Sequence, residues 1–95
     1  MNIRYNLDAD SGLPHIYNHN VSEPEVMDVL RGPLENRPGT GESRILIGRT
    51  RQGRVLRVIV KFYADGQGIF VITAYDLHGK PLKALRRRLK KRGQS

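Results

Sequence analysis

The chain has 95 residues, no cysteine and a formal net charge of +8. This length allows one small domain with a small core, and the absence of cysteine excludes a disulfide framework or a thiolate metal site. No apolar run approaches the length of a membrane span, and the first ten residues lack the features of a signal peptide. We therefore expect a cytoplasmic protein with no membrane partner.

The charge is distributed unevenly. Residues 1–43 carry three Arg and seven Asp or Glu, a net charge of −4, whereas residues 44–95 carry fourteen Lys or Arg and two Asp, a net charge of +12. Such asymmetry indicates a polyanionic partner, most often nucleic acid. An acidic membrane surface or an acidic protein would also fit the charge alone.

The first half of the chain predicts a short strand over residues 2–7, then a helical turn over 15–19 that Asn20 closes in the left-handed conformation. A helix follows, because Ser22 is a good N-cap and Glu25, three residues later, completes a capping box. Gly32 and Pro33 end this helix. We expect residues 34–43 to form a loop.

The second half predicts three strands and a helix. The strands span residues 44–51, 54–63 and 69–76, rich in β-branched and aromatic residues and separated by glycine-containing turns. The helix spans 80–92, and residues 93–95 form a disordered tail. The expected fold is α+β, a single domain over residues 1–95 in the order β-α-α-β-β-β-α, with helices packed on one face of an antiparallel sheet.

Alternation along the last two strands predicts which side chains face the core. The core positions of the third strand would be Phe70, Ile72 and Ala74. The opposite, open face would carry Arg57, Lys61, Tyr63, Thr73 and Tyr75. Basic and phenolic groups in this arrangement can bind phosphate and stack on bases, but an ordinary polar strand face has the same pattern, and the alternation does not decide between them.

No sequence signature of a known catalytic class is present: there is no P-loop, HExxH, GxSxG or dinucleotide fingerprint. His15 and His19 are four residues apart, but they lack a third metal ligand, so we expect no metal and no cofactor. Either histidine has the chemistry of a general base, although packing or capping of the turn explains them as well.

Three segments together carry a resemblance to a known family. The residues HNVS and then Glu25 resemble the K-H-G-V-S-F-E-E-A signature of BrnT-type toxins in the RelE-like superfamily. RILIGRT, residues 44–50, resembles the family's R-x-x-x-I-G-R-S/T strand, and VITAY, residues 71–75, resembles its I-I-S-A-R strand. An uncharacterised toxin-like family with an early His and G-I/V-S-x-E-x-V is similar too. The resemblance implies a RelE-like fold and a type II toxin that cleaves RNA, free or on the ribosome, with a ribbon-helix-helix antitoxin.

Within that resemblance, His19 and Glu25 match the helix signature and Arg49 matches the arginine of I-G-R. Tyr75 stands where the family has arginine, so this chain either has lost that charge or replaces it with Arg57 or Lys61. The resemblance thus implies a catalytic set in which a base takes the 2′-OH proton and cations stabilise the phosphorane. The set is His19, Glu25, Arg49, Arg57, Lys61 and Tyr75.

The basic C-terminal helix has an apolar stripe of Leu82, Leu85 and Leu89, which we expect to pack on the sheet. The proposed RNA-binding residues fan outward from it: Arg86, Arg87, Arg88, Lys90 and Lys91. Whether the protein is a metal-independent endoribonuclease stays open, because a non-catalytic RNA-binding module or a protein that docks an acidic partner has the same features.

Overall fold

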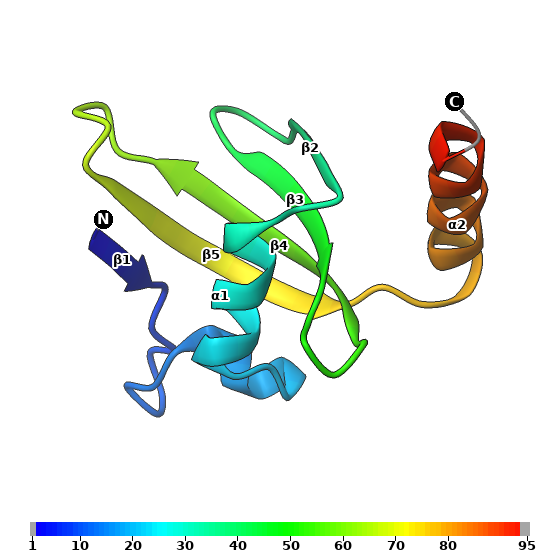
Figure 1. The fold of residues 1–95 in the computed structure, drawn as a ribbon. Helices are drawn as coiled ribbons and strands as arrows, with labels where there is room; N and C mark the ends of the chain where they lie inside the picture. The colour runs from blue at the N-terminus through cyan, green and yellow to red at the C-terminus, as the bar shows by residue number, and fades with distance from the viewer. Residues whose placement is uncertain (1, 94–95) are drawn as a thin grey trace.

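The computed structural model describes residues 2–93. It confirms an α+β fold built on one five-stranded sheet (Figure 1). The strands are β1 (Asn2–Tyr5), β2 (Glu35–Pro38), β3 (Arg44–Arg49), β4 (Val55–Phe62) and β5 (Gly68–Asp76). Their spatial order is β1-β5-β4-β3-β2, so the last four strands form a meander and β1 is added beside the final strand.

Two expectations about the sheet were wrong. The sheet is mixed, because β1 pairs parallel to β5 while the other pairs are antiparallel. Short hairpin turns make neighbouring strands of the meander antiparallel. Two helical segments connect β1 to the meander, and a connection of this length allows a parallel pair. The loop predicted over residues 34–43 contains β2, a polar edge strand that the absence of apolar alternation had concealed.

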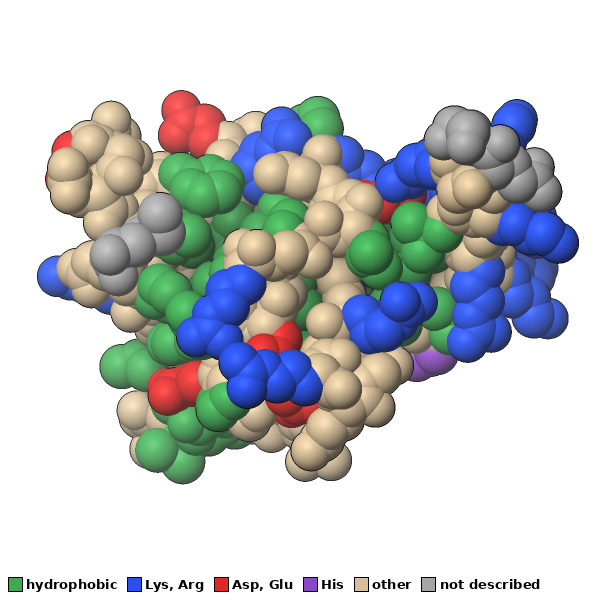
Figure 2. Space-filling view, viewed as in Figure 1, with side chains coloured by type: hydrophobic (Ala, Val, Ile, Leu, Met, Phe, Trp, Pro, Cys, Tyr) green, Lys and Arg blue, Asp and Glu red, His purple; other side chains and the backbone are tan. Residues whose placement is uncertain are grey.

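The helical segments are η1 (His15–His19), α1 (Glu23–Arg31) and α2 (Gly79–Gly93). The expected turn at η1 is a short 3₁₀ helix, and Asn20 closes it in the left-handed conformation with φ of 62°. Gly93 belongs to α2 and not to a tail, and residues 94–95 lie outside the described part of the chain. Lys and Arg side chains cover the outer surface of α2 (Figure 2). Among residues 2–93, no helix is both long and apolar enough to cross a bilayer.

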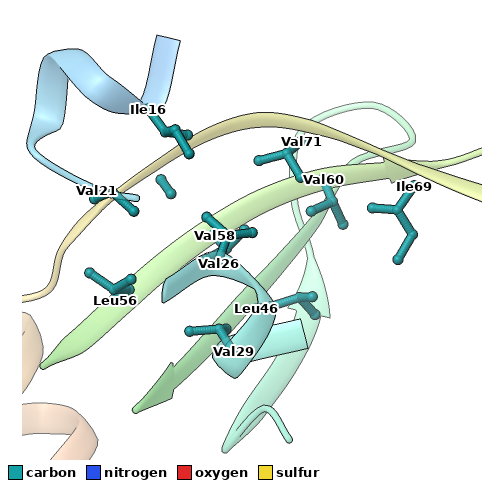
Figure 3. Packing of buried hydrophobic residues seen from close by; sticks show 11 residues of the cluster. Ile16, Val21, Val26, Val29, Leu46, Leu56, Val58, Val60, Ile69 and Val71 are labelled. Atoms are coloured by element: carbon teal, nitrogen blue, oxygen red, sulfur yellow. The ribbon is translucent and has the colours of Figure 1, made fainter. Parts of the chain in front are cut away.

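The main core lies between the sheet and the helical segments η1 and α1. Val26 and Val29 of α1 pack over the sheet, and the cluster continues to Ile16 of η1 (Figure 3). Gly48 of β3 permits this close approach, since a Cβ there would lie 3.0 Å from Cγ1 of Val29. The other buried residues of this cluster are Val21, Leu46, Leu56, Val58, Val60, Ile69, Val71 and Ala74.

The helices do not share one face of the sheet, contrary to expectation. Leu85 of α2 is 1% exposed and packs with Ile47 and Leu77 in a second cluster. Ile47 alternates with Leu46 along β3, so this cluster lies on the face opposite α1. Both faces of β3 are apolar, which gives α2 a separate docking surface, and the predicted leucine stripe is confirmed.

A β-bulge in β5 explains why its predicted core was partly wrong. Ile59 of β4 pairs with Thr73, but the next residue, Val60, pairs with Val71, which leaves Ile72 as an extra residue. One extra residue reverses the alternation beyond it. Ala74 is therefore buried as predicted, whereas Phe70 and Ile72 are only partly buried and Ile69 and Val71 take the core positions.

Candidate active site at the edge of the sheet

Four side chains from η1, β5 and β4 form a continuous row at the edge of the sheet. The rings of His15 and His19 meet edge to face with centroids 5.2 Å apart, and the ring of His19 meets that of Tyr75 at 5.9 Å. The guanidinium carbon of Arg57 lies 5.9 Å from the centroid of the same Tyr75 ring. We call these four residues, His15, His19, Tyr75 and Arg57, the edge cluster.

The strand register explains how the row arises. Tyr75 and Arg57 are directly opposite each other on β5 and β4, so both face the side of the sheet that carries α2. β1 ends at Tyr5, opposite Val71, so η1 rather than a strand lies beside the last residues of β5. His19 of η1 thereby reaches the ring of Tyr75 from the open edge, and His15 contacts His19 in turn.

Arg57 has no carboxylate partner among residues 2–93. Its Nε is buried and makes no hydrogen bond, and the buried hydroxyl of Thr73 on the adjacent strand is likewise unpaired. A buried polar group without a partner is costly, so native structures rarely keep one without a use. The bare guanidinium of Arg57 is therefore a candidate anion site, with Tyr75 supporting it from one side.

Arg54, which sequence reasoning missed, fixes the edge cluster in place. Its guanidinium donates to both carboxylate oxygens of Asp76 at 2.6 and 3.0 Å and to those of Glu25 at 3.0 and 3.1 Å. It also donates to the backbone carbonyls of Asn20 at 2.7 Å and His19 at 3.4 Å. The hydrogen bonds to Asp76 raise the pKa of Arg54 further. One side chain thus ties the end of η1 to α1 and to β5.

Glu25 is in the predicted capping box, where its carboxylate is fully engaged. The backbone N–H of Ser22 donates to it at 3.0 Å, and Ser22 Oγ accepts from the Glu25 backbone at 3.3 Å. Burial opposes ionisation, but hydrogen bonds from Ser22 and Arg54 outweigh it and hold the pKa of Glu25 below its ordinary value. A carboxylate held in this way is a weak base, so its contacts indicate a structural role.

The other two predicted catalytic cations, Arg49 and Lys61, lie at different distances from Arg57. Arg49 is exposed and pairs with Val55, one diagonal step from Arg57 on the same face, a spacing of about 7–8 Å. Lys61 lies four residues from Arg57 along β4, roughly 13 Å away at about 3.3 Å per residue. Arg49 therefore borders the edge cluster, whereas Lys61 lies outside it.

His15 joins the site although the catalytic prediction omitted it. The amide nitrogen of Asn18 lies 3.5 Å from Nδ1 of His15 and donates to the Asp8 carboxylate at 2.7 Å. That hydrogen bond from Asn18 lowers the pKa of Asp8. The i, i+4 spacing of the two histidines was the signal for their pairing, but nothing in the sequence placed Tyr75 beside them.

The basic face of α2 differs from the prediction in its members. Arg88 does not fan outward: it donates to both oxygens of Glu35 at 2.7 and 2.9 Å, and Arg92 binds the same carboxylate. Among the described residues, no hydrogen bond or ion pair holds the outward-facing cations. These cations, which we call the outer face of α2, are Lys80, Lys83, Arg86, Arg87, Lys90 and Lys91.

A groove of about 800 Å³ on the α1 side is a poor candidate for a nucleic-acid site. Glu23, Glu25 and Asp28 line it together with Arg31 and Arg51. Three negative and two positive charges give it a formal net charge of −1, which does not attract phosphate. Asp28 also pairs with Arg51 at 3.3 Å, which neutralises a cation of the groove. Within residues 2–93, no group of three or more His, Asp or Glu side chains is placed to hold a metal ion.

Comparison with known proteins gives one match. The family model described as "Domain of unknown function (DUF4258)" matches residues 15–76. The matched segment begins at His15 and ends at Asp76, so it contains the whole edge cluster and Arg54 but excludes α2. No curated protein and no solved structure matches the chain.

Proposed function

This chain belongs to the DUF4258 family, and we propose that it is a metal-independent endoribonuclease whose active site is the edge cluster. The observation that supports the proposal most strongly is the contact of Tyr75 with both His19 and the unpaired Arg57. A proton acceptor and a fixed positive charge then contact the same ring. RNA cleavage by its own 2′-OH needs this combination.

In the proposed reaction, His19 accepts the proton of the 2′-OH, and the 2′-oxygen forms a bond to the adjacent phosphorus. The guanidinium of Arg57, with the Tyr75 hydroxyl, stabilises the charged phosphorane. His15 gives a proton to the 5′-oxygen as the P–O5′ bond breaks. The products are a 2′,3′-cyclic phosphate and a 5′-hydroxyl end, and both histidines exchange protons with water before the next cycle.

The proposal is tested by incubating purified protein with single-stranded RNA in EDTA, free and in the presence of ribosomes. We expect cleavage that leaves cyclic phosphate ends, and no cleavage of the same sequence with 2′-O-methyl groups. His19→Ala should reduce the rate by about 10²–10⁴-fold and Arg57→Ala by about 10²–10³-fold. The bordering Arg49→Ala should cost about tenfold, since it matches the family arginine but touches the site only diagonally.

Matched controls come from the same residue types elsewhere in the chain. His78 lies between β5 and α2, and Arg31 is an exposed residue at the end of α1 on the other face. His78→Ala and Arg31→Ala should keep the parent rate. If folded His19→Ala and Arg57→Ala variants cleave at the parent rate, the edge cluster is not the active site.

The proposal extends to a RelE-like toxin of a toxin–antitoxin pair, in which a ribbon-helix-helix antitoxin blocks the enzyme. What supports it is the motif resemblance together with the edge cluster, and induced expression tests it. Growth and RNA integrity should fall together and recover with His19→Ala. Normal growth and intact RNA at high expression would contradict the toxin. RNA binding without cleavage would instead favour the non-catalytic binding module, which the outer face of α2 equally suits.

A further inference from the structure

A second row of side chains crosses the open face of the sheet away from the edge cluster. Phe70 of β5 pairs with Lys61 of β4 on one side and with Arg4 of β1 on the other. Residues paired in register share a face. Because Ile3 and Tyr5 of β1 pack against the main core, Arg4 and its row lie on the opposite face.

The fold itself makes little use of this row. Phe70 is partly buried and belongs to neither hydrophobic cluster, although it is among the largest apolar side chains of the chain. Arg4 and Lys61 are exposed, and within residues 2–93 neither makes a hydrogen bond or ion pair. The row is therefore an aromatic ring flanked by two uncompensated cations.

The charge of the sheet face around this row indicates which kind of ligand the row would bind. Arg57 and Arg49 lie further along the same face, and the acidic residue that shares it, Glu35, is neutralised by Arg88 and Arg92. A face with unpaired cations and a partly exposed ring offers what single-stranded nucleic acid requires: positive charge along the backbone and a surface on which a base stacks.

The row lies at a distance from the edge cluster that a short oligonucleotide spans. Phe70 is five residues from Tyr75 on β5, roughly 17 Å at about 3.3 Å per residue. Both aromatic residues face the same side of the sheet, each directly opposite a cation of β4. Two base-stacking positions on one strand would hold an extended RNA chain along β5.

We propose that Arg4, Phe70 and Lys61 form a base-stacking subsite for single-stranded RNA, which binds the substrate several nucleotides from the scissile phosphate. This inference rests on the proposed function, because it takes the edge cluster as the place of cleavage. It gives Lys61 a binding role in place of the catalytic one expected from the sequence. The subsite requires unstacked bases, so double-stranded RNA is excluded from it.

The test measures binding of 2′-O-methyl RNA, which cannot be cleaved by 2′-OH attack, as a dinucleotide and as an oligomer of about six nucleotides. Phe70→Leu should weaken the longer oligomer about tenfold, the usual scale for removal of one base stack, and leave the dinucleotide unchanged. Phe70→Tyr should keep the parent affinity. Lys61→Gln and Arg4→Gln should each flatten the log–log salt dependence by roughly 0.7.

Phe62 provides the matched control. It is 49% exposed on β4 and pairs with the core residue Ile69, so it lies on the other face of the sheet. Phe62→Leu removes an exposed ring without touching the proposed subsite and should bind both RNAs as the parent does. Thermal unfolding checks that each variant is folded. If Phe70→Leu does not fold, the exposed Lys61→Gln variant still tests the proposal.

The outcomes separate the subsite from the proposed function. Parent-like binding of the longer oligomer by Phe70→Leu, or an unchanged salt slope for Lys61→Gln, overturns the subsite even if RNA is cleaved. No binding of the oligomer by the parent protein overturns it too, as does an equal loss in Phe62→Leu. If binding depends on Phe70 but ordinary RNA is not cleaved, the result supports the subsite and contradicts the proposed endoribonuclease function.

Discussion

Arg54 and Arg57 are three residues apart in the chain, but the fold treats them in opposite ways. Arg54 is held by two carboxylates and two carbonyls that join η1, α1 and β5. Arg57 has a buried Nε with no partner and faces the side of the sheet that α2 covers only in part. The first arginine is explained by the fold it stabilises, whereas the second is explained only by something that binds it.

The two faces of the sheet differ in the same way as these two arginines, because one face is occupied by the fold and the other is largely open. The face under α1 and η1 is closed, with a core of interdigitated aliphatic residues (Figure 3). On the other face, the leucine stripe of α2 packs against Ile45 and Ile47 of β3 and Val55 of β4. We infer that stability is concentrated on the first face and ligand binding on the second, and four predictions test this division.

The largest expected effect comes from truncating one leucine on each face. Leu56→Ala and Leu85→Ala each remove a fully buried side chain, so each should cost about 2–5 kcal/mol of unfolding free energy. They should differ in what unfolds. Leu56→Ala should weaken the whole domain, whereas Leu85→Ala should release α2 and leave the η1–α1 core folded. Amide exchange measured along the chain distinguishes the two, and uniform loss of protection in both variants would contradict the division.

Replacing each arginine separates structure from function more directly. Arg54→Met leaves Glu25 and Asp76 unpaired, and because Arg54 is 25% exposed we expect a loss of about 2–3 kcal/mol, below the range for a fully buried pair. Arg57→Met removes the unpaired buried nitrogen, so it should leave the unfolding free energy unchanged or raise it by about 1–3 kcal/mol. Urea unfolding of both variants checks this. Equal losses of unfolding free energy would mean that Arg57 is structural and that its unpaired Nε does not indicate a binding site.

The docking of α2 should depend on pH through Glu35. Hydrogen bonds from Arg88 lower the pKa of this buried carboxyl from 4.5 to about 2. A lowered pKa means that the stabilisation is complete above about pH 4.5 and is lost as the pH falls toward 2. Its size should be about 2 kcal/mol, less than the shift alone implies because Arg88 and Arg92 are partly exposed.

Glu35→Gln isolates this contribution from the other carboxyls with lowered pKa, which are Asp8, Glu25 and Asp76. The difference in unfolding free energy between the parent and Glu35→Gln should be about 2 kcal/mol at pH 7 and should shrink toward zero near pH 2. A difference that stays constant over this range would show that Glu35 does not hold α2 through its charge.

A structural feature was predictable from the sequence where the residues that determine it are close together in the chain. The capping box of α1, the left-handed Asn20 and the leucine stripe of α2 each follow from residues within one turn or one helix, and each is confirmed. The bulge at Ile72 was not predictable from alternation, because the register of β5 is set by its packing against β4. It reversed the assigned faces of the residues before it.

The candidate site shows the same limit. Histidines four residues apart in η1 were visible in the sequence, but the contact of His19 with Tyr75 depends on β1 ending early at the edge of the sheet. Arg54 was overlooked because its four partners come from η1, Asn20, α1 and the end of β5, and they lie as many as 35 positions from Arg54 along the chain. Arg88 was placed outward because Glu35, its partner, lay in a predicted loop.

The smallest expected effect on stability, and the sharpest test of the second face, is removal of charge from the outer face of α2. Arg87, Lys90 and Lys91 are exposed, point away from the leucine stripe and have no described partner. Favourable interaction with the helix dipole is confined to the last turn and is worth at most about 1 kcal/mol at exposed sites. Replacing all three with Gln should therefore change the unfolding free energy by less than about 0.5 kcal/mol. RNA binding should weaken, and its log–log salt slope should flatten by roughly 0.7 for each phosphate that is no longer neutralised, because fewer condensed counterions are released. If the slope stays at the parent value, these cations serve only to solvate α2 or to dock an acidic protein, and RNA binding would be confined to the open face of the sheet.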